Sequence, residues 1–212
     1  NGQVILDNGD HLICDSKLGV VRRFNRWGRW VAEETYIFCG NERVSTPNDL
    51  AVHTDGRIYF TDSTRYNGKV WLKELAGNQE IIASGLDYPN GIVICPKFEC
   101  LYVAESYKNR ILKINIEPPH DVSVFALLPE HISKRKEQNL PDGLALDEDD
   151  NLWVAHYGME AVHILSPGGQ VLQTINTGIP LTSNIFMLGK DKVIITGGYG
   201  EPGPGSLAVF QL

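Results

Sequence analysis

The sequence predicts an all-β protein built from repeats, and three observations support this prediction. Five segments share one pattern and begin near residues 1, 48, 90, 142 and 184, so the period is 42 to 52 residues. Each repeat contains short β-rich runs separated by Asx and Gly turns, as around Asp55-Gly56. No helical periodicity alternates with these runs. Four short strands in a repeat of this length predict the blades of a β-propeller.

The four strands are expected in the same order in every repeat. The first follows the Asn or Asp that opens the repeat, and the second ends in a polar residue, as at Asp62, Glu105 and His156. The third strands are expected at 19–24, 68–73, 109–114 and 161–165. The outer strands are expected at 30–32, 80–83, 122–125 and 170–174. The side chains of Trp27, Trp30, Trp71 and Trp153 are expected to pack inside the blades.

One segment departs from the repeat pattern. Residues 129–138 lie in the longest interval and are expected to form an inserted loop with at most one helical turn. Two interpretations of this loop stay open, a mobile lid and an exposed insertion without a role.

The number of repeats raises a question of closure. Residues 1–212 are expected to form a single propeller domain, yet four full repeats and a partial fifth do not complete a comfortable ring. The first residue already lies inside the repeat pattern. We therefore expect the first one to one and a half repeats to be missing at the N-terminus, with a four- or five-bladed ring as the alternative.

Composition excludes several classes of protein. The chain has 212 residues, 42% hydrophobic and 21% charged, with a net charge of −7, so a soluble globular domain is expected. The acidic excess argues against a nucleic-acid partner. No run of 18 apolar residues exists, so no membrane span is expected. No signal peptide is visible in the sequence, and this favours a location in the cytoplasm. The sequence does not indicate an oligomeric state.

The four cysteines also favour the cytoplasm. Cys14, Cys39 and Cys95 lie in apolar, strand-like runs and are expected to be buried free thiols. Cys95 and Cys100 flank a short turn, so a disulfide between them is the alternative.

The repeat starts contain the residues that best fit a functional site. They read Pro47-Asn48-Asp49, Pro89-Asn90-Gly91 and Pro141-Asp142-Gly143. Equivalent positions of successive blades surround one axis, so Asn48, Asn90 and Asp142 are expected to converge. Their amide and carboxylate oxygens suit Ca²⁺ or Mg²⁺. The alternative is that these tripeptides are ordinary turns.

Nearly the whole chain resembles the gluconolactonase/regucalcin family of calcium-dependent six-bladed β-propellers. The matching stretches are 43–49, 55–62, 89–91, 140–147 and 151–155. The resemblance implies six blades and a calcium ion, or another divalent cation such as Zn²⁺, Mg²⁺ or Mn²⁺. The family's two Asn ligands and its Asp ligand match Asn48, Asn90 and Asp142. Its fourth ligand, a Glu of the first blade, has no counterpart in this sequence.

The resemblance also implies hydrolysis of a sugar lactone or a related small ester. The ion would polarise the carbonyl, and Asp142 would assist the attacking water. Arg43, Asn90, Asn184 and His156 are expected to contact the substrate. No membrane or nucleic-acid partner is implied.

Two alternatives to the lactonase stay open. One is a non-catalytic propeller that binds a partner and holds calcium for structural reasons. The other is an arylesterase- or strictosidine-synthase-like protein, because that group shares segments like 59–63 and 89–91. A serine hydrolase with a Gly-x-Ser-x-Gly elbow is disfavoured because that motif is absent from the sequence.

Overall fold

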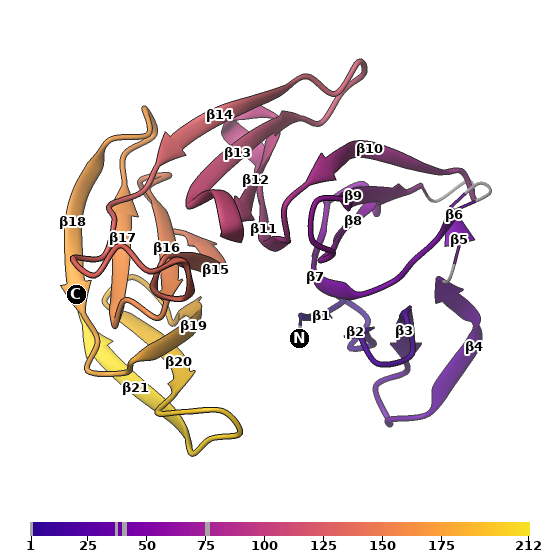
Figure 1. Ribbon diagram of the computed structural model, residues 1–212. Helices are drawn as coiled ribbons and strands as arrows, with labels where there is room; N and C mark the ends of the chain where they lie inside the picture. The colour runs from indigo at the N-terminus through magenta and orange to yellow at the C-terminus, as the bar shows by residue number, and fades with distance from the viewer. Residues whose placement is uncertain (1, 37, 40–41, 75–76) are drawn as a thin grey trace. The chain divides into compact units, whose positions relative to one another are not determined.

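The computed structural model describes residues 2–36, 38–39, 42–74 and 77–212. Contacts divide the chain into two compact units, Asn1–Ile94 and Cys95–Leu212, and each unit is described by itself. Nearly all of the regular structure is β-strand, as Figure 1 shows. Within the described ranges, no helix has the length and apolar character that crossing a membrane requires.

The first unit contains two complete four-stranded sheets and a small ribbon between them. Neighbouring strands are antiparallel and follow one another along the chain. The sheets are β1 (Gln3–Ile5), β2 (His11–Asp15), β3 (Val20–Phe24) and β4 (Trp30–Tyr36), then β7 (Pro47–Val52), β8 (Ile58–Asp62), β9 (Gly68–Lys73) and β10 (Gln79–Leu86), with the ribbon β5 (Phe38–Cys39) and β6 (Glu42–Arg43).

The remaining strands form three further sheets in the orders β11-β12-β13-β14, β15-β16-β17-β18 and β19-β20-β21. The boundary between the units falls inside β11 (Pro89–Cys95). The other strands are β12 (Cys100–Glu105), β13 (Arg110–Asn115), β14 (Val122–Leu127), β15 (Leu140–Leu146), β16 (Leu152–Tyr157), β17 (Ala161–Leu165), β18 (Val171–Asn176), β19 (Leu181–Met187), β20 (Lys192–Gly198) and β21 (Gly205–Gln211), with 3₁₀ turns η1 (Pro96–Phe98), η2 (Ser106–Lys108) and η3 (Lys136–Gln138).

These five sheets have the strand order of propeller blades, which confirms the expected architecture. The expected number of six blades is wrong for the described chain, which has five, the last with three strands. The described chain has five blades because each of the five repeats supplies one sheet. The inserted segment 129–138 contains only the single 3₁₀ turn η3, as expected.

Burial decreases from the middle strands of a blade to its outer strand. All five residues of β8 are buried, whereas most of β18 is exposed. Trp71 and Trp153 are buried in the blades as expected, and Trp71 stacks on Phe60 with ring centroids 5.9 Å apart. The same expectation is wrong for Trp27 and Trp30, which are 78% and 53% exposed. They lie at the tip of the β3–β4 hairpin, where Arg26 and Arg22 cover their rings.

Three cysteine side chains are described, and all three are free and buried: Cys14, Cys95 and Cys100. This confirms the expectation of buried thiols for Cys14 and Cys95, and no disulfide joins Cys95 to Cys100. The side chain of Cys39 lies outside the described set. Burial raises the pKa of the Cys100 thiol to about 11, so this thiol stays protonated at neutral pH.

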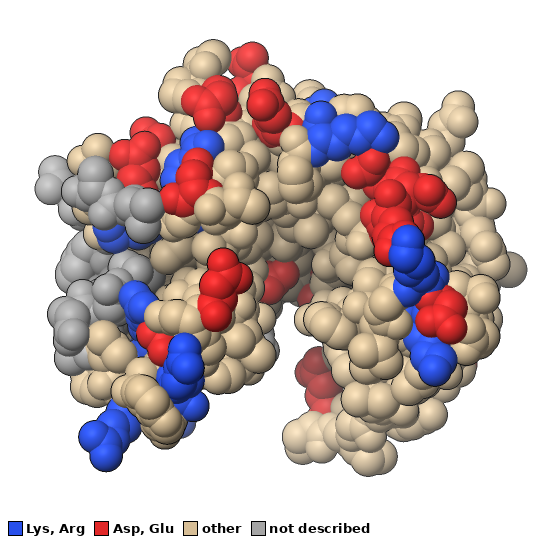
Figure 2. All heavy atoms as spheres, turned by 180° about the vertical axis from the view of Figure 1, so that it is seen from behind, with Lys and Arg blue, Asp and Glu red and all other residues tan. Residues whose placement is uncertain are grey.

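Charged side chains of both signs are interspersed on the face shown in Figure 2. Ion pairs join several charged side chains of the protein, such as Arg65 with the buried carboxylate of Asp87 at 2.6 Å and Lys97 with Asp150 at 2.6 Å. The absence of a nucleic-acid partner stays a prediction.

Candidate functional site

Asn48 and Asn90 occupy equivalent places near the starts of β7 and β11 in the first unit. Both tripeptides that contain them are extended strand, so the interpretation of these tripeptides as turns is wrong. The hydroxyl of Thr61 accepts a hydrogen bond from the N–H of Asp49 at 3.1 Å and donates one to the carbonyl of Asn90 at 2.7 Å. This hydroxyl therefore ties the backbones that carry the two asparagines.

Asp49 adds a second link between the same strands. Its carboxylate accepts hydrogen bonds from the N–H groups of Leu50 at 2.9 Å and Ile92 at 3.0 Å. Burial raises the pKa of Asp49 to about 6, although both hydrogen bonds act in the opposite direction. Asp49 directly follows a predicted ligand, but the repeat pattern did not predict a role for its side chain.

Three serines fix the carbonyl groups that precede the three predicted ligands. The Ser16 hydroxyl donates to the carbonyl of Pro47 at 2.7 Å, that of Ser63 to Pro89, and that of Ser106 to Pro141 at 2.7 Å. Each serine directly follows the last residue of the second strand of its blade. These hydrogen bonds place Asn48, Asn90 and Asp142 in equivalent local settings.

The acidic residues at the ends of the second strands have structural partners. Asp62 accepts hydrogen bonds from the N–H groups of Ser45 and Thr46 at 2.9 and 2.7 Å. It thereby holds the segment that leads from Arg43 to Asn48. The Arg43 side chain is exposed in β6. Glu105 is buried and pairs with Arg110 at 2.6 Å.

In the second unit, Asp142 is half-buried near the start of β15. The next residue, Gly143, lies against the neighbouring strand β19, because a Cβ atom at this position would clash with Oδ1 of Asn184. Asn184 is exposed, and its Oδ1 accepts a hydrogen bond from the N–H of Ile185 at 2.8 Å. The structure therefore brings Asp142 and Asn184 to adjacent strands.

The pairing of β19 with β20 aligns the fifth repeat with the other repeats one residue away from the alignment that the sequence suggested, in which Asn184 opens the repeat. Thr182 pairs with Gly197 and Asn184 with Thr196, and Ser183 lies in the irregularity between these pairs. Asp142 lies in the equivalent irregularity of β15, between Pro141 and Leu144. Ser183, which the repeat pattern did not predict as a site residue, is thus the counterpart of Asp142. Its hydroxyl donates to the carbonyl of Thr196 at 3.2 Å.

His156 is fully buried near the end of β16 and belongs to a hydrogen-bonded series. Its Nδ1 lies 2.8 Å from Nε2 of His163, whose Nδ1 lies 2.9 Å from the Thr174 hydroxyl. Burial lowers the pKa of His156 to about 3 and that of His163 to about 4, so both rings are neutral at pH 7. Sequence reasoning named His156 and missed His163, which the hairpin places diagonally across on the same face.

The predicted ligands fit a hard cation by their chemistry. Amide and carboxylate oxygens are the ligands that Ca²⁺ prefers. Among the described residues, no three His, Cys, Asp or Glu side chains cluster in a way that would hold a metal ion, so a site here depends on the asparagine amides. Asn48 and Asn90 lie in the first unit and Asp142 in the second, and their convergence stays a prediction. Asn1, which opens the first repeat, is outside the described residues.

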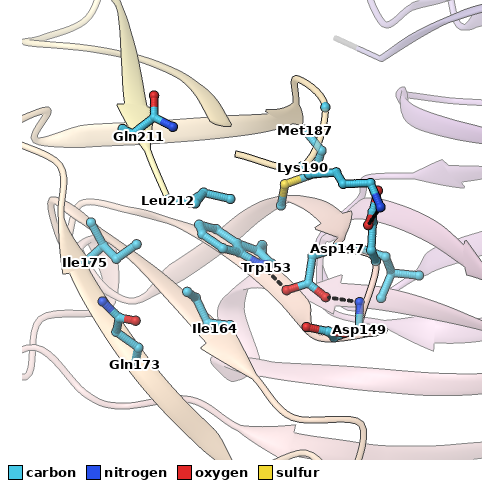
Figure 3. Close-up of a pocket in the computed structure, with 13 residues that line it drawn as sticks. Asp147, Asp149, Trp153, Ile164, Gln173, Ile175, Met187, Lys190, Gln211 and Leu212 are labelled. Atoms are coloured by element: carbon cyan, nitrogen blue, oxygen red, sulfur yellow. Dashed lines mark hydrogen bonds and ion pairs between the residues drawn. The ribbon is translucent and has the colours of Figure 1, made fainter. Parts of the chain in front are cut away.

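A pocket of about 630 Å³ lies in the second unit, at the opposite end of β15 from Asp142. Trp153, Ile164, Ile175 and Met187 contribute its apolar wall (Figure 3). The Asp147 carboxylate is held by the indole N–H of Trp153 at 2.9 Å and the N–H of Asp149 at 3.0 Å. None of the residues predicted for the functional site lines this pocket.

Comparison with known proteins identifies the family of the chain. Residues 1–196 match the family model described as the SMP-30/Gluconolactonase/LRE-like region. The chain therefore belongs to this family, which confirms the resemblance drawn from the sequence. A gluconolactonase of Zymomonas mobilis is 29% identical over 207 residues, which cover 88% of this chain and 57% of that protein.

A second curated relative has a related name. The lactonase drp35 of Staphylococcus aureus is 27% identical over 174 residues, which cover 76% of this chain and 53% of that protein. The chain thus spans about half the length of the curated relatives it matches.

Solved structures share the fold. A gluconolactonase from Xanthomonas campestris superposes with a TM-score of 0.79 at 24% identity, covering 99% of this chain and 72% of that one. A virginiamycin B lyase from Staphylococcus aureus superposes with a TM-score of 0.71 at 17% identity, covering 100% of this chain and 69% of that one. Because proteins named for different reactions share this architecture, the structural likeness shows the fold alone.

Proposed function

We propose that this protein is a calcium-dependent hydrolase of a sugar lactone or a related small ester. Membership of the family and the names of the curated relatives support this proposal. The observation that carries it is the repeated serine–proline hydrogen bond, which gives Asn48, Asn90 and Asp142 equivalent backbone settings at the starts of three inner strands. Equivalent positions in successive blades favour a shared site on the propeller axis.

In this proposal, Asn48, Asn90 and Asp142 hold the cation through two amide oxygens and one carboxylate. When bound, a divalent cation supplies a Lewis acid that polarises a carbonyl and stabilises the oxyanion formed on attack by water. The Asp142 carboxylate also accepts the proton of that water. A carboxylate that binds a cation is a weak base, so much of the rate must come from the positioning of the water.

Three further side chains are proposed to contact the substrate, in addition to Asn90. Arg43 has an exposed guanidinium group that can donate several hydrogen bonds to substrate oxygens. Asn184 uses Oδ1 for the N–H of Ile185 and keeps its amide NH₂ for a substrate oxygen. The third side chain is the imidazole of His156.

Hydrolysis can be measured as acid release from glucono-δ-lactone by the 212-residue chain, with calcium and with a chelator. We expect Asp142→Asn to lower kcat at least 100-fold, as for loss of a positioned general base. Asp149→Asn, an exposed residue of the same unit, is the matched control and should keep the activity. Binding of the lactone without hydrolysis by the unmodified chain would instead favour a non-catalytic binding module.

A further inference from the structure

The pocket in the second unit lies away from the proposed hydrolytic site. Its volume is about 630 Å³, within the range of about 300–1,000 Å³ that small-molecule sites occupy. Leu146 lines the pocket at the end of β15, whereas Asp142 lies near the start of the same strand. At about 3.3 Å per residue of extended chain, these two positions are roughly 13 Å apart. The ligand of this pocket must therefore be inferred from the pocket's own walls.

One wall of the pocket is a row of side chains that crosses three paired strands. Trp153 of β16 pairs with Ile164 of β17, and Ile164 pairs with Gln173 of β18. Trp153 and Ile164 are buried in the sheet, whereas Gln173 is exposed at its rim. Met187, the last residue of β19, adds a thioether from the neighbouring sheet. An indole ring, a branched alkyl group and a thioether favour the binding of an aromatic ring.

The turn after β15 forms another wall, and hydrogen bonds fix its shape. One oxygen of the Asp147 carboxylate accepts hydrogen bonds from the N–H groups of Asp149 at 3.0 Å and Asn151 at 2.8 Å. The other oxygen accepts from the side-chain amide of Asn151 at 3.0 Å and from the indole N–H of Trp153 at 2.9 Å (Figure 3). These four hydrogen bonds hold the turn against the Trp153 ring, so the pocket is formed before a ligand enters it.

The charged groups of the pocket are mainly acidic. Asp147, Glu148 and Asp149 line it, and Lys190 is the one cation among the lining residues that the structure describes. Nζ of Lys190 lies 2.7 Å from Oε2 of Glu148. Oε1 of Glu148 accepts no hydrogen bond from the described residues. Three carboxylates beside one ammonium group favour a second cation and disfavour an anion.

We propose that this pocket binds a small primary amine that carries an aromatic ring. The ring lies against Trp153, Ile164 and Met187, and the ammonium group donates a hydrogen bond to Oε1 of Glu148. Such an amine is charged at pH 7, as a lysine side chain is. The apolar wall selects arylalkylamines over short alkylamines, because a short alkyl chain buries less apolar surface. The inference goes beyond the proposed hydrolysis and does not depend on it.

Four related compounds test the charge and the ring separately. The indole ¹⁵N–¹H signal of Trp153, assigned by its loss in Trp153→Phe, reports binding without turnover. We expect 4-phenylbutylamine to shift this signal with a Kd on the order of 1 mM. The neutral 4-phenylbutanol should bind about fivefold more weakly, the effect of one exposed ion pair. The anionic 4-phenylbutyrate and the ringless butylamine should each bind at least about tenfold more weakly than 4-phenylbutylamine. Equal affinities for the amine and the carboxylate, or an amine that leaves the Trp153 signal unshifted, would overturn the inference.

The partner of the ammonium group is tested at Glu148. Glu148→Gln removes the charge and keeps the shape of the side chain. We expect the affinity for 4-phenylbutylamine to fall about fivefold and that for 4-phenylbutanol to change by less than about twofold. Asp121→Asn, at another exposed position of the same unit, is the matched control and should change neither affinity. An equal loss for both compounds in Glu148→Gln, or no loss for the amine, would contradict the proposed contact and overturn the inference.

The place of the ring is tested at the exposed rim of β18. Gln173→Trp introduces an indole ring into the pocket and should abolish the shift caused by 4-phenylbutylamine. Leu172→Trp is the matched control, because Leu172 is exposed beside Gln173 and does not line the pocket. It should leave the binding unchanged. Binding to Gln173→Trp as tight as to the unmodified chain would mean that the amine binds outside the pocket, and the inference would fail.

Discussion

The carboxylate of Asp49 joins two strands that are far apart in the sequence, because its Oδ2 accepts a hydrogen bond of 3.0 Å from the N–H of Ile92. Asn48 directly precedes Asp49, and Asn90 lies two residues before Ile92. The two amide side chains proposed as ligands are therefore held on adjacent backbones by a carboxylate that is not itself proposed as a ligand. This arrangement makes Asp49 a positioning residue.

Replacement of Asp49 should disturb the fold and the proposed site together. Asp49→Ala leaves the N–H groups of Leu50 and Ile92 without their acceptor. We expect a loss of about 1–3 kcal/mol in the free energy of unfolding. Urea titration measures this loss, with Asp7→Ala as an exposed control in the same unit. An unchanged unfolding midpoint would contradict the structural role of Asp49.

Gly143 should tolerate no larger residue, because a Cβ atom there would meet the side chain of Asn184 and also the backbone carbonyl of Ser183. A Cβ atom at Gly143 would overlap Oδ1 of Asn184, so Gly143→Ala should destabilise the protein by about 1–3 kcal/mol. Gly168→Ala is the control, since its nearest neighbour would be the Ser166 hydroxyl at 3.7 Å. Adding Asn184→Gly to Gly143→Ala should recover part of the loss, and a thermal melt showing no recovery would count against this contact.

The serine hydrogen bonds should influence ligand geometry more than stability. Ser106→Ala removes the donor to the carbonyl of Pro141 and frees the backbone that carries Asp142. We expect calcium affinity to fall about fivefold, the effect of one neutral hydrogen bond. Ser123→Ala, on an exposed outer strand, is the matched control. Equal affinities in the two variants would mean that the hydrogen bond only joins the blades.

The histidine pair predicts a loss of stability in acid. Both pKa values are lowered on folding, from 6.5 to about 3 for His156 and about 4 for His163. Below pH 6.5 the unfolded chain therefore binds protons that the folded chain does not, so stability falls as pH falls. From pH 7 to pH 5 this amounts to about 2 kcal/mol per histidine.

His163→Gln removes one of these titrating groups. Its free energy of unfolding should therefore change less between pH 7 and pH 5 than that of the unmodified chain. The raised pKa of Asp49 acts in the opposite direction, but it is common to both proteins and cancels in the comparison. A parallel pH dependence for the two proteins would contradict the lowered pKa of His163.

Much of the fold could be predicted from the spacing of the repeats. Short β-rich runs separated by polar turns recur with each blade, and β7, β8, β15 and β16 lie where this pattern places them. The exposure of Trp27 could not be predicted, because a large aromatic residue fits a blade interior equally well by composition. Its place at a hairpin tip depends on the register of β3 with β4.

The candidate site was predicted less completely than the fold. The Asn and Asp residues at three repeat starts were visible, but the fifth repeat offered two polar residues, and only strand pairing places Ser183 in register with Asp142. Asp49 and His163 depend on contacts between strands, which one sequence does not reveal. The extended Pro-Asn-Gly segment shows the same limit, because its glycine is typical of a turn and lies in a strand.

Calcium titration by calorimetry on the 212-residue chain, beside Asn48→Ala and Asp142→Ala, tests whether Asn48 and Asp142 bind the same cation. We expect a single binding event in the unmodified chain that each variant weakens at least tenfold, because the proposed function assigns Asn48 and Asp142 to the same ion. An unmodified chain that does not bind calcium, or two variants that bind it as tightly as the unmodified chain, would contradict the claim that Asn48 and Asp142 belong to one metal site.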